Sequence, residues 1–547
     1  MEIFGQIVFL LAGCGVFMLG FKLLSEHMEK LVGNGLKSFF NKISNNKFLG
    51  LLIGLITTVI IQSSSVTTVM VVGFVNSGIM TLIQATAVII GANIGTTITA
   101  YLAGLSAAGG IASIINYLCL ACLFIGVFIE MFAKNDNKKS LGLILAGLGA
   151  VFLGLETMSN SMSFMREVPE INNFIATLDN PFLLLFIGVA FTAIVQSSSA
   201  VTSIIVLITA SNQNAFGGTG NAVYFLILGS NIGTCVTAMI SGVGASTNAR
   251  RASLIHLLFN TFGAVIFTVL LLIWKGFSVT LIESWITSKE WQICAFHTIF
   301  NCTCALIFLP LSKYLVKIAT FILKDKKVEE KDPSELVFMD KRLAFAPSIS
   351  LPMLKKDVFR MADMSMNCLH NAFDMFINRD TSKYKEVERQ NEVIAKLGKN
   401  LTDALVQVSS NQNLIEVEKQ INVLHTNVGD IVRIAELSEN LIKYTEKEIK
   451  QDIYFSDEIV NKLTEMCKLL DVQYSHVKGL SLEGNTSISA EMIESLEDKI
   501  DDMRRTLIAD HIERLKQGKC KPENNTIFIN LVSNLERIGD HIFYIFN

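Results

Sequence analysis

Seven predominantly apolar stretches lie within residues 1–323, each of about 20 residues, the length of a helix that crosses the hydrocarbon core of a bilayer. They are Ile3–Leu24, Ile79–Leu102, Ile111–Phe132, Leu141–Met158, Val223–Ile240, Leu254–Trp274 and Ile293–Leu311. Two further segments, 49–75 and 182–210, are apolar but are interrupted by Ser, Thr and Gln. The sequence therefore predicts an all-α, polytopic membrane domain over residues 1–323.

The distribution of charged residues changes near residue 324. Residues 1–323 contain 26 Lys, Arg, Asp and Glu side chains, whereas residues 324–547 contain 69. The first part has 15 basic and 11 acidic residues, and the second part has 31 and 38. We therefore expect the membrane domain to be followed by a water-soluble, acidic domain.

Basic residues beside the apolar stretches predict the orientation of the chain. Lys134, Lys138 and Lys139 lie between two stretches, and Lys313 and Lys317 follow the last one. By the positive-inside rule, the C-terminal half is expected in the cytoplasm. No signal-peptide cleavage pattern follows the first stretch, so we expect it to be retained as a helix of a multi-pass protein in the cytoplasmic (inner) membrane.

The membrane domain contains an internal repeat. The segment Gln62–Ser65, of sequence Gln-Ser-Ser-Ser, recurs at Gln196–Ser199 with an offset of 134 residues. Upstream, the same offset relates Gly20 to Gly154, Asn46 to Asn180, Gly54 to Gly188 and Thr58 to Thr192. Downstream, Gly91–Ala100 recurs at Gly229–Ala238 with an offset of 138, so four residues are inserted, most simply within 211–221. We expect repeat 1 over about 1–132, repeat 2 over about 139–275 and an extra helix over 293–323.

Duplicated halves with polar breaks at matching positions are typical of transporters, whose binding site lies near the bilayer midplane between the repeats. A Gln followed by three Ser residues between apolar runs predicts a turn between two half-helices. The free backbone N–H groups and hydroxyls of such a turn suit a small anion, and its oxygens suit Na⁺. Hydropathy leaves open whether the repeats are inverted or parallel.

The candidate ligands for substrate or ion are the polar residues of the two repeated motifs. They are Gln62, Ser63, Ser64, Ser65, Asn93, Thr96 and Thr97 in the first repeat, and Gln196, Ser197, Ser198, Ser199, Asn231 and Thr234 in the second. An alternative is that these hydroxyls donate to carbonyls of their own helices or join helices together. The occurrence of both motifs in register favours the ligand role.

Five further residues are weaker candidates for the same site: Thr58, Thr192, Arg251, His256 and Asn260. Arg251 has a positive charge that attracts an anion, but it equally fits a loop anchor at the membrane surface. His256 and Asn260 are four residues apart on one helix face, and hydrogen bonding between helices is the alternative for them.

These motifs resemble those of the Na/Pi-cotransporter family, which is related to the type II sodium–phosphate cotransporters. The resemblance rests on the two Gln-Ser-Ser-Ser segments, the two Gly-x-Asn-Ile-Gly-Thr segments at 91–96 and 229–234, and the pattern Arg251-Ala-x-x-x-His256-x-x-Phe-Asn260. It covers essentially the whole membrane domain. It implies inverted repeats, re-entrant hairpins whose tips contain Gln-Ser-Ser-Ser, and Na⁺-coupled movement of inorganic phosphate.

The first repeat departs from this pattern at Ala112–Asn116, where the second has the Arg-Ala-x-x-x-His stretch. The resemblance therefore implies no paired role for Arg251 or His256. Cys235 stands where the first repeat has Thr97, so no ligand role is implied for this position in the second repeat.

Residues 324–354 contain Pro333, Pro347 and Pro352 with mixed charges and predict a linker. The domain 355–547 that follows has apolar residues at helical spacing. Six amphipathic helices are predicted, at about 355–378, 383–408, 412–446, 454–480, 488–518 and 523–547. They predict an all-α bundle of two three-helix units.

The last of these helices contains Asn534–His541, which resembles the signature of PhoU, a helical protein of phosphate signalling. In that family, carboxylate pairs such as Glu536 and Asp540 hold metal ions. The matching stretch Asp430–Glu436 has Val432 in place of the first Glu, so the resemblance implies no metal site there. An ordinary solvated helix face, with Arg537 as an ion-pair partner, is the alternative for Glu536 and Asp540.

We therefore expect sodium-coupled transport of inorganic phosphate across the cytoplasmic membrane, regulated by a cytoplasmic PhoU-like domain. A membrane-anchored phosphate sensor that binds without translocating is the alternative. An enzyme acting on a lipid-linked substrate has little support, since no base accompanies the hydroxyl motif. The expected partners are phosphate, sodium and the lipid bilayer, with a homodimer left open and no nucleic acid.

Overall fold

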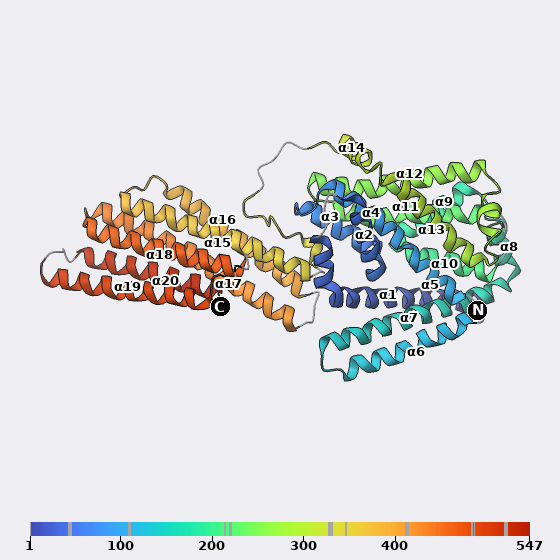
Figure 1. Ribbon diagram of the computed structural model, residues 1–547, viewed down its shortest axis with the longest axis horizontal. Coiled ribbons are helices and arrows are strands. Elements are labelled where there is room, and N and C mark those ends of the chain that lie inside the picture. The colour runs from blue at the N-terminus through green and yellow to red at the C-terminus, as the bar shows by residue number, and fades with distance from the viewer. Residues whose placement is uncertain are drawn as a thin grey trace. The chain divides into compact units, whose positions relative to one another are not determined.

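The computed structural model describes residues 2–41, 46–107, 111–212, 215–217, 221–325, 332–344, 347–410, 415–482, 485, 487–518 and 523–546. Every regular element within these residues is a helix (Figure 1). The chain forms two compact units, Met1–Val328 and Glu329–Asn547. The all-helical fold predicted from the sequence is confirmed for the described residues.

Fourteen α-helices are described in the first unit. They are α1 (Glu2–Asn41), α2 (Lys47–Ile61), α3 (Ser64–Asn76), α4 (Leu82–Gly95), α5 (Thr97–Ala107), α6 (Ile111–Phe132), α7 (Asp136–Arg166), α8 (Pro169–Thr177), α9 (Pro181–Val195), α10 (Ser198–Ser211), α11 (Ala222–Gly242), α12 (Thr247–Ile273), α13 (Lys289–Phe308) and α14 (Ser312–Ile322). Seven spans within them are long and apolar enough to cross a membrane, or eight if α8 and α9, bent by 107°, form one span. Each of the seven predicted stretches overlaps one of these seven spans.

The two interrupted segments form pairs of short helices. The first pair, α2 and α3, is broken at Gln62–Ser63, and the second, α9 and α10, at Gln196–Ser197. The longest of these helices has 15 residues, which at about 1.5 Å per residue is about 22 Å, less than the thickness of a hydrocarbon core. A polar tip inside each apolar segment was predicted, and the breaks occur at the predicted residues.

Glycines allow the first helix of each pair to touch the helix that follows the pair in the same repeat. A Cβ on Gly54 of α2 would lie 2.0 Å from the carbonyl oxygen of Val88 in α4. The equivalent Cβ on Gly188 of α9 would lie 2.3 Å from the carbonyl oxygen of Leu226 in α11. Since these distances exclude any side chain, the helices pack backbone to backbone in both copies, and the sequence repeat corresponds to a repeated packing unit.

Helices α1 and α7 occupy equivalent positions in the two repeats and pack against each other through glycines (Figure 1). A Cβ on Gly13 would lie 2.9 Å from the carbonyl oxygen of Gly154, and a Cβ on Gly20 would lie 2.7 Å from that of Gly147. The contact advances along α1 while it retreats along α7, so the two helices run antiparallel. Gly147 and Gly154 are the counterparts of Gly13 and Gly20 at the offset of 134.

The second unit contains six described α-helices: α15 (Pro347–Asn378), α16 (Tyr384–Ser409), α17 (Ile415–Lys450), α18 (Asp457–Ser481), α19 (Ala490–Lys516) and α20 (Glu523–Phe546). Each corresponds to one predicted amphipathic helix. Helices α15, α16 and α17 contact one another, as do α18, α19 and α20, and α17 also packs on α20. The apolar residues at helical spacing, such as Leu397, Leu401 and Leu405, are buried.

The stretch predicted as a linker is partly folded. Helix α15 begins at Pro347, eight residues before the predicted helix, because Ile349, Leu351 and Leu354 are buried. A proline is tolerated at the start of a helix, where its missing N–H has no partner to lose. Residues 337–339 are held on α15 by the Asp357 carboxylate, which accepts from three successive backbone N–H groups at 2.9 to 3.0 Å. Residues 326–331 and 345–346 of the predicted linker lie outside the described residues.

Candidate functional site

The two helix breaks have the same backbone geometry. Gln62 ends α2 with φ 58° and ψ 25°, and Gln196 ends α9 with φ 57° and ψ 23°. Each Gln donates its backbone N–H to the carbonyl four residues earlier, on Thr58 or Thr192, at 2.7 Å. A residue other than glycine in the left-handed region is strained by on the order of 1–3 kcal/mol, and such strain is concentrated at functional sites.

The first serine of each motif begins the second helix. The Ser63 hydroxyl accepts from the backbone N–H of Val66 (3.3 Å), and the Ser197 hydroxyl accepts from that of Ala200 (3.2 Å). The remaining serines, at 64–65 and 198–199, form the first turns of α3 and α10. The N–H groups of a first helical turn have no partner within the helix and attract anions. Each tip therefore combines hydroxyls with the N-terminus of a buried helix.

The repeated Asn and Thr residues are buried, and their donors bond within their own helices. Asn93 Nδ2 donates to Ile89 O (2.8 Å), and Asn231 Nδ2 donates to Ile227 O (3.1 Å). The hydroxyls of Thr96 and Thr234 likewise donate to carbonyls four residues earlier. This is the back-bonding alternative left open by the sequence. It leaves the carboxamide oxygens and hydroxyl lone pairs available to a cation.

The position of Thr97 and Cys235 differs between the repeats. Thr97 begins α5 after a break in the span, and its hydroxyl donates to Ile94 O at 2.8 Å. In the second repeat α11 is continuous, and the Cys235 thiol contacts Asn231 O at 3.7 Å. The two copies therefore offer different donor atoms at this point of an otherwise repeated motif.

Few of the predicted residues contact residues outside their own helix turns. The Thr99 hydroxyl donates to the Gln62 carboxamide oxygen (3.3 Å), which ties the first tip to α5. The Thr58 hydroxyl donates to that of Thr67 (3.1 Å), and the Thr192 hydroxyl donates to that of Ser230 (2.9 Å). Within the described part of the chain, no hydrogen bond or ion pair joins one tip to the other. Instead α3 packs on α11 and α10 packs on α5, so each second helix contacts the other repeat.

Thr99 was not among the residues singled out in the sequence. The signal for it was present, because Thr99 and its counterpart Thr237 both belong to the repeated block at 91–100 and 229–238.

Arg251 has the contacts of an anchor. Its Nε and Nη2 both donate to the carbonyl of Leu323 (2.9 and 2.7 Å), and its Nη1 lies 2.9 Å from the Asp325 carboxylate. These bonds fasten the end of α14 to α12. His256 is fully buried on α12, and among the described residues neither of its ring nitrogens has a hydrogen-bond partner. Asn260 Nδ2 donates to His256 O (3.1 Å), one turn away.

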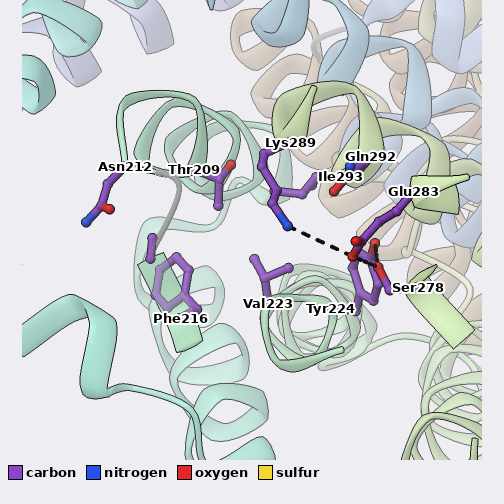
Figure 2. Close-up of a pocket in the computed structure, with 11 residues that line it drawn as sticks. Thr209, Asn212, Phe216, Val223, Tyr224, Ser278, Glu283, Lys289, Gln292 and Ile293 are labelled. Carbon is purple, nitrogen blue, oxygen red and sulfur yellow. Dashed lines mark hydrogen bonds and ion pairs between the residues drawn. The ribbon is translucent and has the colours of Figure 1, made fainter. Parts of the chain in front are cut away.

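A pocket opens among the ends of α10, α11 and α13 (Figure 2). A chain of polar groups lines it: the hydroxyls of Tyr224 and Ser278 lie 2.8 Å apart, Ser278 donates to Glu283 (2.7 Å), and Lys289 lies 3.9 Å from Glu283. None of the predicted site residues lines this pocket. Since its polar groups bond mainly to one another, they hold the segment between α12 and α13 in place.

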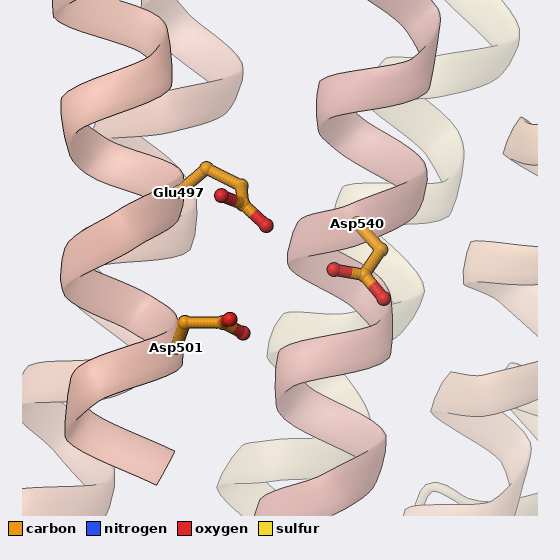
Figure 3. A group of neighbouring side chains, drawn as sticks. All are labelled: Glu497, Asp501 and Asp540. Carbon is orange, nitrogen blue, oxygen red and sulfur yellow. The ribbon is translucent and has the colours of Figure 1, made fainter. Parts of the chain in front are cut away.

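In the second unit, Asp540 belongs to an acidic cluster that includes a neighbouring helix (Figure 3). One carboxylate oxygen each of Glu497 and Asp501 on α19 and Asp540 on α20 lie within 4.8 Å of one another. Burial, and after it the charge of Asp501, raises the pKa of Asp540. Glu536 lies one turn before Asp540, and its carboxylate is 3.6 Å from Arg504. The sequence pointed to α20 but missed Glu497 and Asp501, because residues on α19 become neighbours only in the folded bundle.

Comparison with known proteins gives a family match for each of the two units. The model of the Na⁺/Pi-cotransporter family matches residues 16–160 and 168–283, and that of the PhoU domain matches residues 358–445 and 463–547. The chain is 20% identical over 533 residues to a Salmonella typhimurium protein named "Putative inorganic phosphate export protein YjbB", covering 97% of this chain and 95% of that protein. It is 26% identical over 328 residues to the uncharacterized protein YqeW of Bacillus subtilis, covering 58% of this chain and 97% of that one.

Human sodium-dependent phosphate transport protein 2B is 39% identical over 97 residues, which are 17% of this chain and 14% of the human protein. No solved structure matches the chain. The duplicated hairpin tips, the membrane helices and the helical second unit agree with both family matches. The chain therefore contains a Na⁺/Pi-cotransporter domain, matched over residues 16–160 and 168–283, and a PhoU domain after its membrane helices.

Proposed function

We propose that this protein moves inorganic phosphate across the cytoplasmic membrane in a sodium-coupled cycle, and that its PhoU domain regulates the movement. The observation that supports this most directly is the identical construction of the two tips at Gln62 and Gln196. Two strained breaks of this kind, in matching places of a duplicated membrane domain, are expected at a transport site.

The chemistry of the tips supports both ligands. The first-turn N–H groups of α3 and α10 and the hydroxyls at 64–65 and 198–199 supply donors for phosphate. Oxygens of Gln62, Gln196 and the buried Asn and Thr residues supply ligands for Na⁺. Neither motif contains a Lys or Arg. Because a bare anion is costly to place in a medium of low dielectric constant, bound Na⁺ would supply the compensating charge, which couples the two ions.

We further propose that the repeats are inverted. Helices α1 and α7 are repeat equivalents and pack antiparallel through Gly13, Gly20 and their counterparts, as expected if the second copy is inserted upside down. The short arms of the hairpins support a re-entrant path, in which each hairpin enters and leaves on one side. The basic residues beside the spans support a cytoplasmic second unit.

For the second unit we propose two three-helix units, α15–α17 and α18–α20, and a metal site on the acidic cluster. Glu497, Asp501 and Asp540 would supply hard oxygen ligands, with Glu536 beside them. A metal held there would bind α19 to α20 and so give the regulatory unit two states.

The transport proposal is tested with full-length protein in liposomes. Labelled phosphate should accumulate inside when an inward Na⁺ gradient is imposed, and a K⁺ gradient of the same size should not drive it. Gln62→Ala and Gln196→Ala should each abolish this uptake. Thr86→Val is a matched control, since its buried hydroxyl donates to Leu82 O in its own helix. Phosphate binding with no movement in either direction would instead support the sensor.

The same vesicles test direction and regulation. Reversal of the Na⁺ gradient should drive efflux of preloaded phosphate. The ratio of the uptake rate to the efflux rate then shows which direction of transport is faster. Deletion of residues 330–547 should leave gradient-driven movement intact and change its rate or phosphate dependence. A properly inserted truncation that transports nothing would contradict a purely regulatory role for the PhoU domain.

A further inference from the structure

The two tips differ in one contact although the residues involved are the same in both repeats. In the first repeat the Thr99 hydroxyl donates to Gln62 Oε1 at 3.3 Å, and Gln62 Nε2 donates to Val59 O at 2.6 Å. In the second repeat the counterparts are Gln196 and Thr237. Gln196 is exposed, and the Thr237 hydroxyl oxygen is buried with no hydrogen-bond partner among the described residues.

Sequence differences at the partner positions explain other asymmetries of the tips. Thr192 bonds to Ser230, whereas Thr58 bonds to Thr67, because the repeats have different residues at the partner positions: Ser230 corresponds to Ala92, and Thr67 corresponds to Val201. The Gln and Thr of the open contact are identical in the two copies, and the Gln backbones agree within 2°. The Gln turns of the two tips therefore have the same backbone conformation, and the copies differ in the helix that contains the Thr, since α5 begins after a break at Thr96 whereas α11 is continuous through Thr237.

A buried hydroxyl without a partner is unfavourable, so a conformation in which Thr237 gains a hydrogen-bond partner is favoured by that bond. Gln196 is the partner that the repeat supplies, since the same side chain meets Thr99 in the first copy. We infer that Thr99 and Thr237 are the positioning residues of two alternative Gln–Thr hydrogen bonds, which we call latches. The Gln62–Thr99 latch is closed in the state described here, and the Gln196–Thr237 latch closes in the state open to the opposite side of the membrane.

The packing between helices of the two repeats links the latches, so that closing one latch opposes closing the other. Thr99 lies on α5, which packs on α10, the second helix of the other hairpin. Thr237 lies on α11, which packs on α3, the second helix of the first hairpin. Closing one latch therefore moves a helix that supports the other tip. This inference rests on the proposed transport function. It adds the residues that determine which of the two tips is held by its Gln–Thr hydrogen bond.

The test compares half-saturating phosphate concentrations measured from the two faces of the membrane, in right-side-out and inside-out vesicles containing full-length protein. Thr99→Val weakens the state described here, and Thr237→Val weakens the opposite one. The ratio of the two concentrations should therefore move in opposite directions in the two variants, each by roughly threefold to tenfold, the shift produced by losing one net hydrogen bond. Combining the substitutions should return the ratio toward the wild-type value while lowering the maximal rate.

Thr99→Ser and Thr237→Ser keep the hydroxyl and should leave the ratio unchanged, as should the Thr86→Val control. Thr237→Val is the decisive variant, because Thr237 has no bond to lose in this structure and a purely structural role predicts no effect. If both Val variants move the ratio the same way, or Thr237→Val leaves it unchanged while the wild type transports, the latches are excluded. A wild type that moves no phosphate would overturn the proposed function and the latches together.

Discussion

Gly91 faces Leu51 so closely that a Cβ on the glycine would lie 1.9 Å from the leucine carbonyl oxygen. The equivalent distance from Gly229 to Leu185 O is 2.1 Å. We expect Gly91→Ala and Gly229→Ala each to force the helices apart and to lower stability by about 1–3 kcal/mol, as overpacking does, or to prevent folding. Thermal unfolding in detergent and the yield of folded protein measure this. Gly15→Ala, on α1 with nothing within 4 Å of the new Cβ, is the control. Equal stability of Gly91→Ala and Gly15→Ala would contradict the close packing.

The left-handed backbone at the tips allows the side-chain role of the glutamines to be separated from their conformation. Glycine adopts φ near +58° without strain, so Gln62→Gly and Gln196→Gly should preserve the turn and be stable to within about 1 kcal/mol of wild type or better. They should nevertheless lose sodium-driven phosphate uptake in liposomes. Gln62→Val should lose stability as well, because a β-branched residue is poorly tolerated there. Normal uptake by both Gly variants would remove the carboxamides from the mechanism.

Substitution of Asp540 tests whether the PhoU domain binds a metal ion. Its pKa is raised in the folded state, so the proton stabilises the fold and the ionised carboxylate destabilises it as pH rises through the raised value. In chelator at neutral pH, Asp540→Asn should therefore be more stable than wild type. Added divalent cations should stabilise the wild type and leave the variant unchanged, which calorimetry of the full chain measures. Glu513→Gln, at an exposed position of α19, is the control. Equal stabilisation of Asp540→Asn by metal would exclude the cluster.

Glu448 predicts a local dependence of stability on pH. Its carboxylate is 4% exposed at the end of α17, 3.7 Å from Arg379, and burial raises its pKa from 4.5 to about 7. Because the folded pKa exceeds the unfolded one, stability should fall as pH rises from about 4.5 to 7, by up to about 1.4 kcal/mol per unit, and then level off. The protection factors of amides at the ends of α15 and α17, which correct exchange rates for their intrinsic dependence on pH, should therefore fall over this range. Glu448→Gln should remove this dependence of local stability on pH. If the dependence is unchanged in the variant, other groups cause it.

The helices and their breaks could be predicted because the bilayer restricts the sequence strongly. A span needs about 20 apolar residues, so the seven stretches and the polar interruptions at Gln62 and Gln196 were visible without a structure. Likewise, helical spacing predicted the six helices of the second unit. The start of α15 was placed too late, because Pro347 and Pro352 indicated a linker while the burial of Leu354 depends on tertiary contacts.

Residues that matter through their neighbours were harder to predict. Thr99 is one of many hydroxyls in the apolar spans, and only the fold shows that it reaches Gln62. Glu497 and Asp501 are 39 or more residues from Asp540 in the chain and meet it only because α19 and α20 are antiparallel. The sequence repeat did mark Thr99 and Thr237, because both occupy the same position of the repeated block.

The glycine contact between α1 and α7 has the form of a two-fold symmetric interface inside one chain. Gly13 meets the counterpart of Gly20, and Gly20 meets the counterpart of Gly13, so one surface serves both partners. Interfaces of this self-complementary kind ordinarily join two identical subunits. A single helix sequence therefore suffices to form both sides of the contact, and the fused chain contains internally the arrangement that two half-length chains would reach by association.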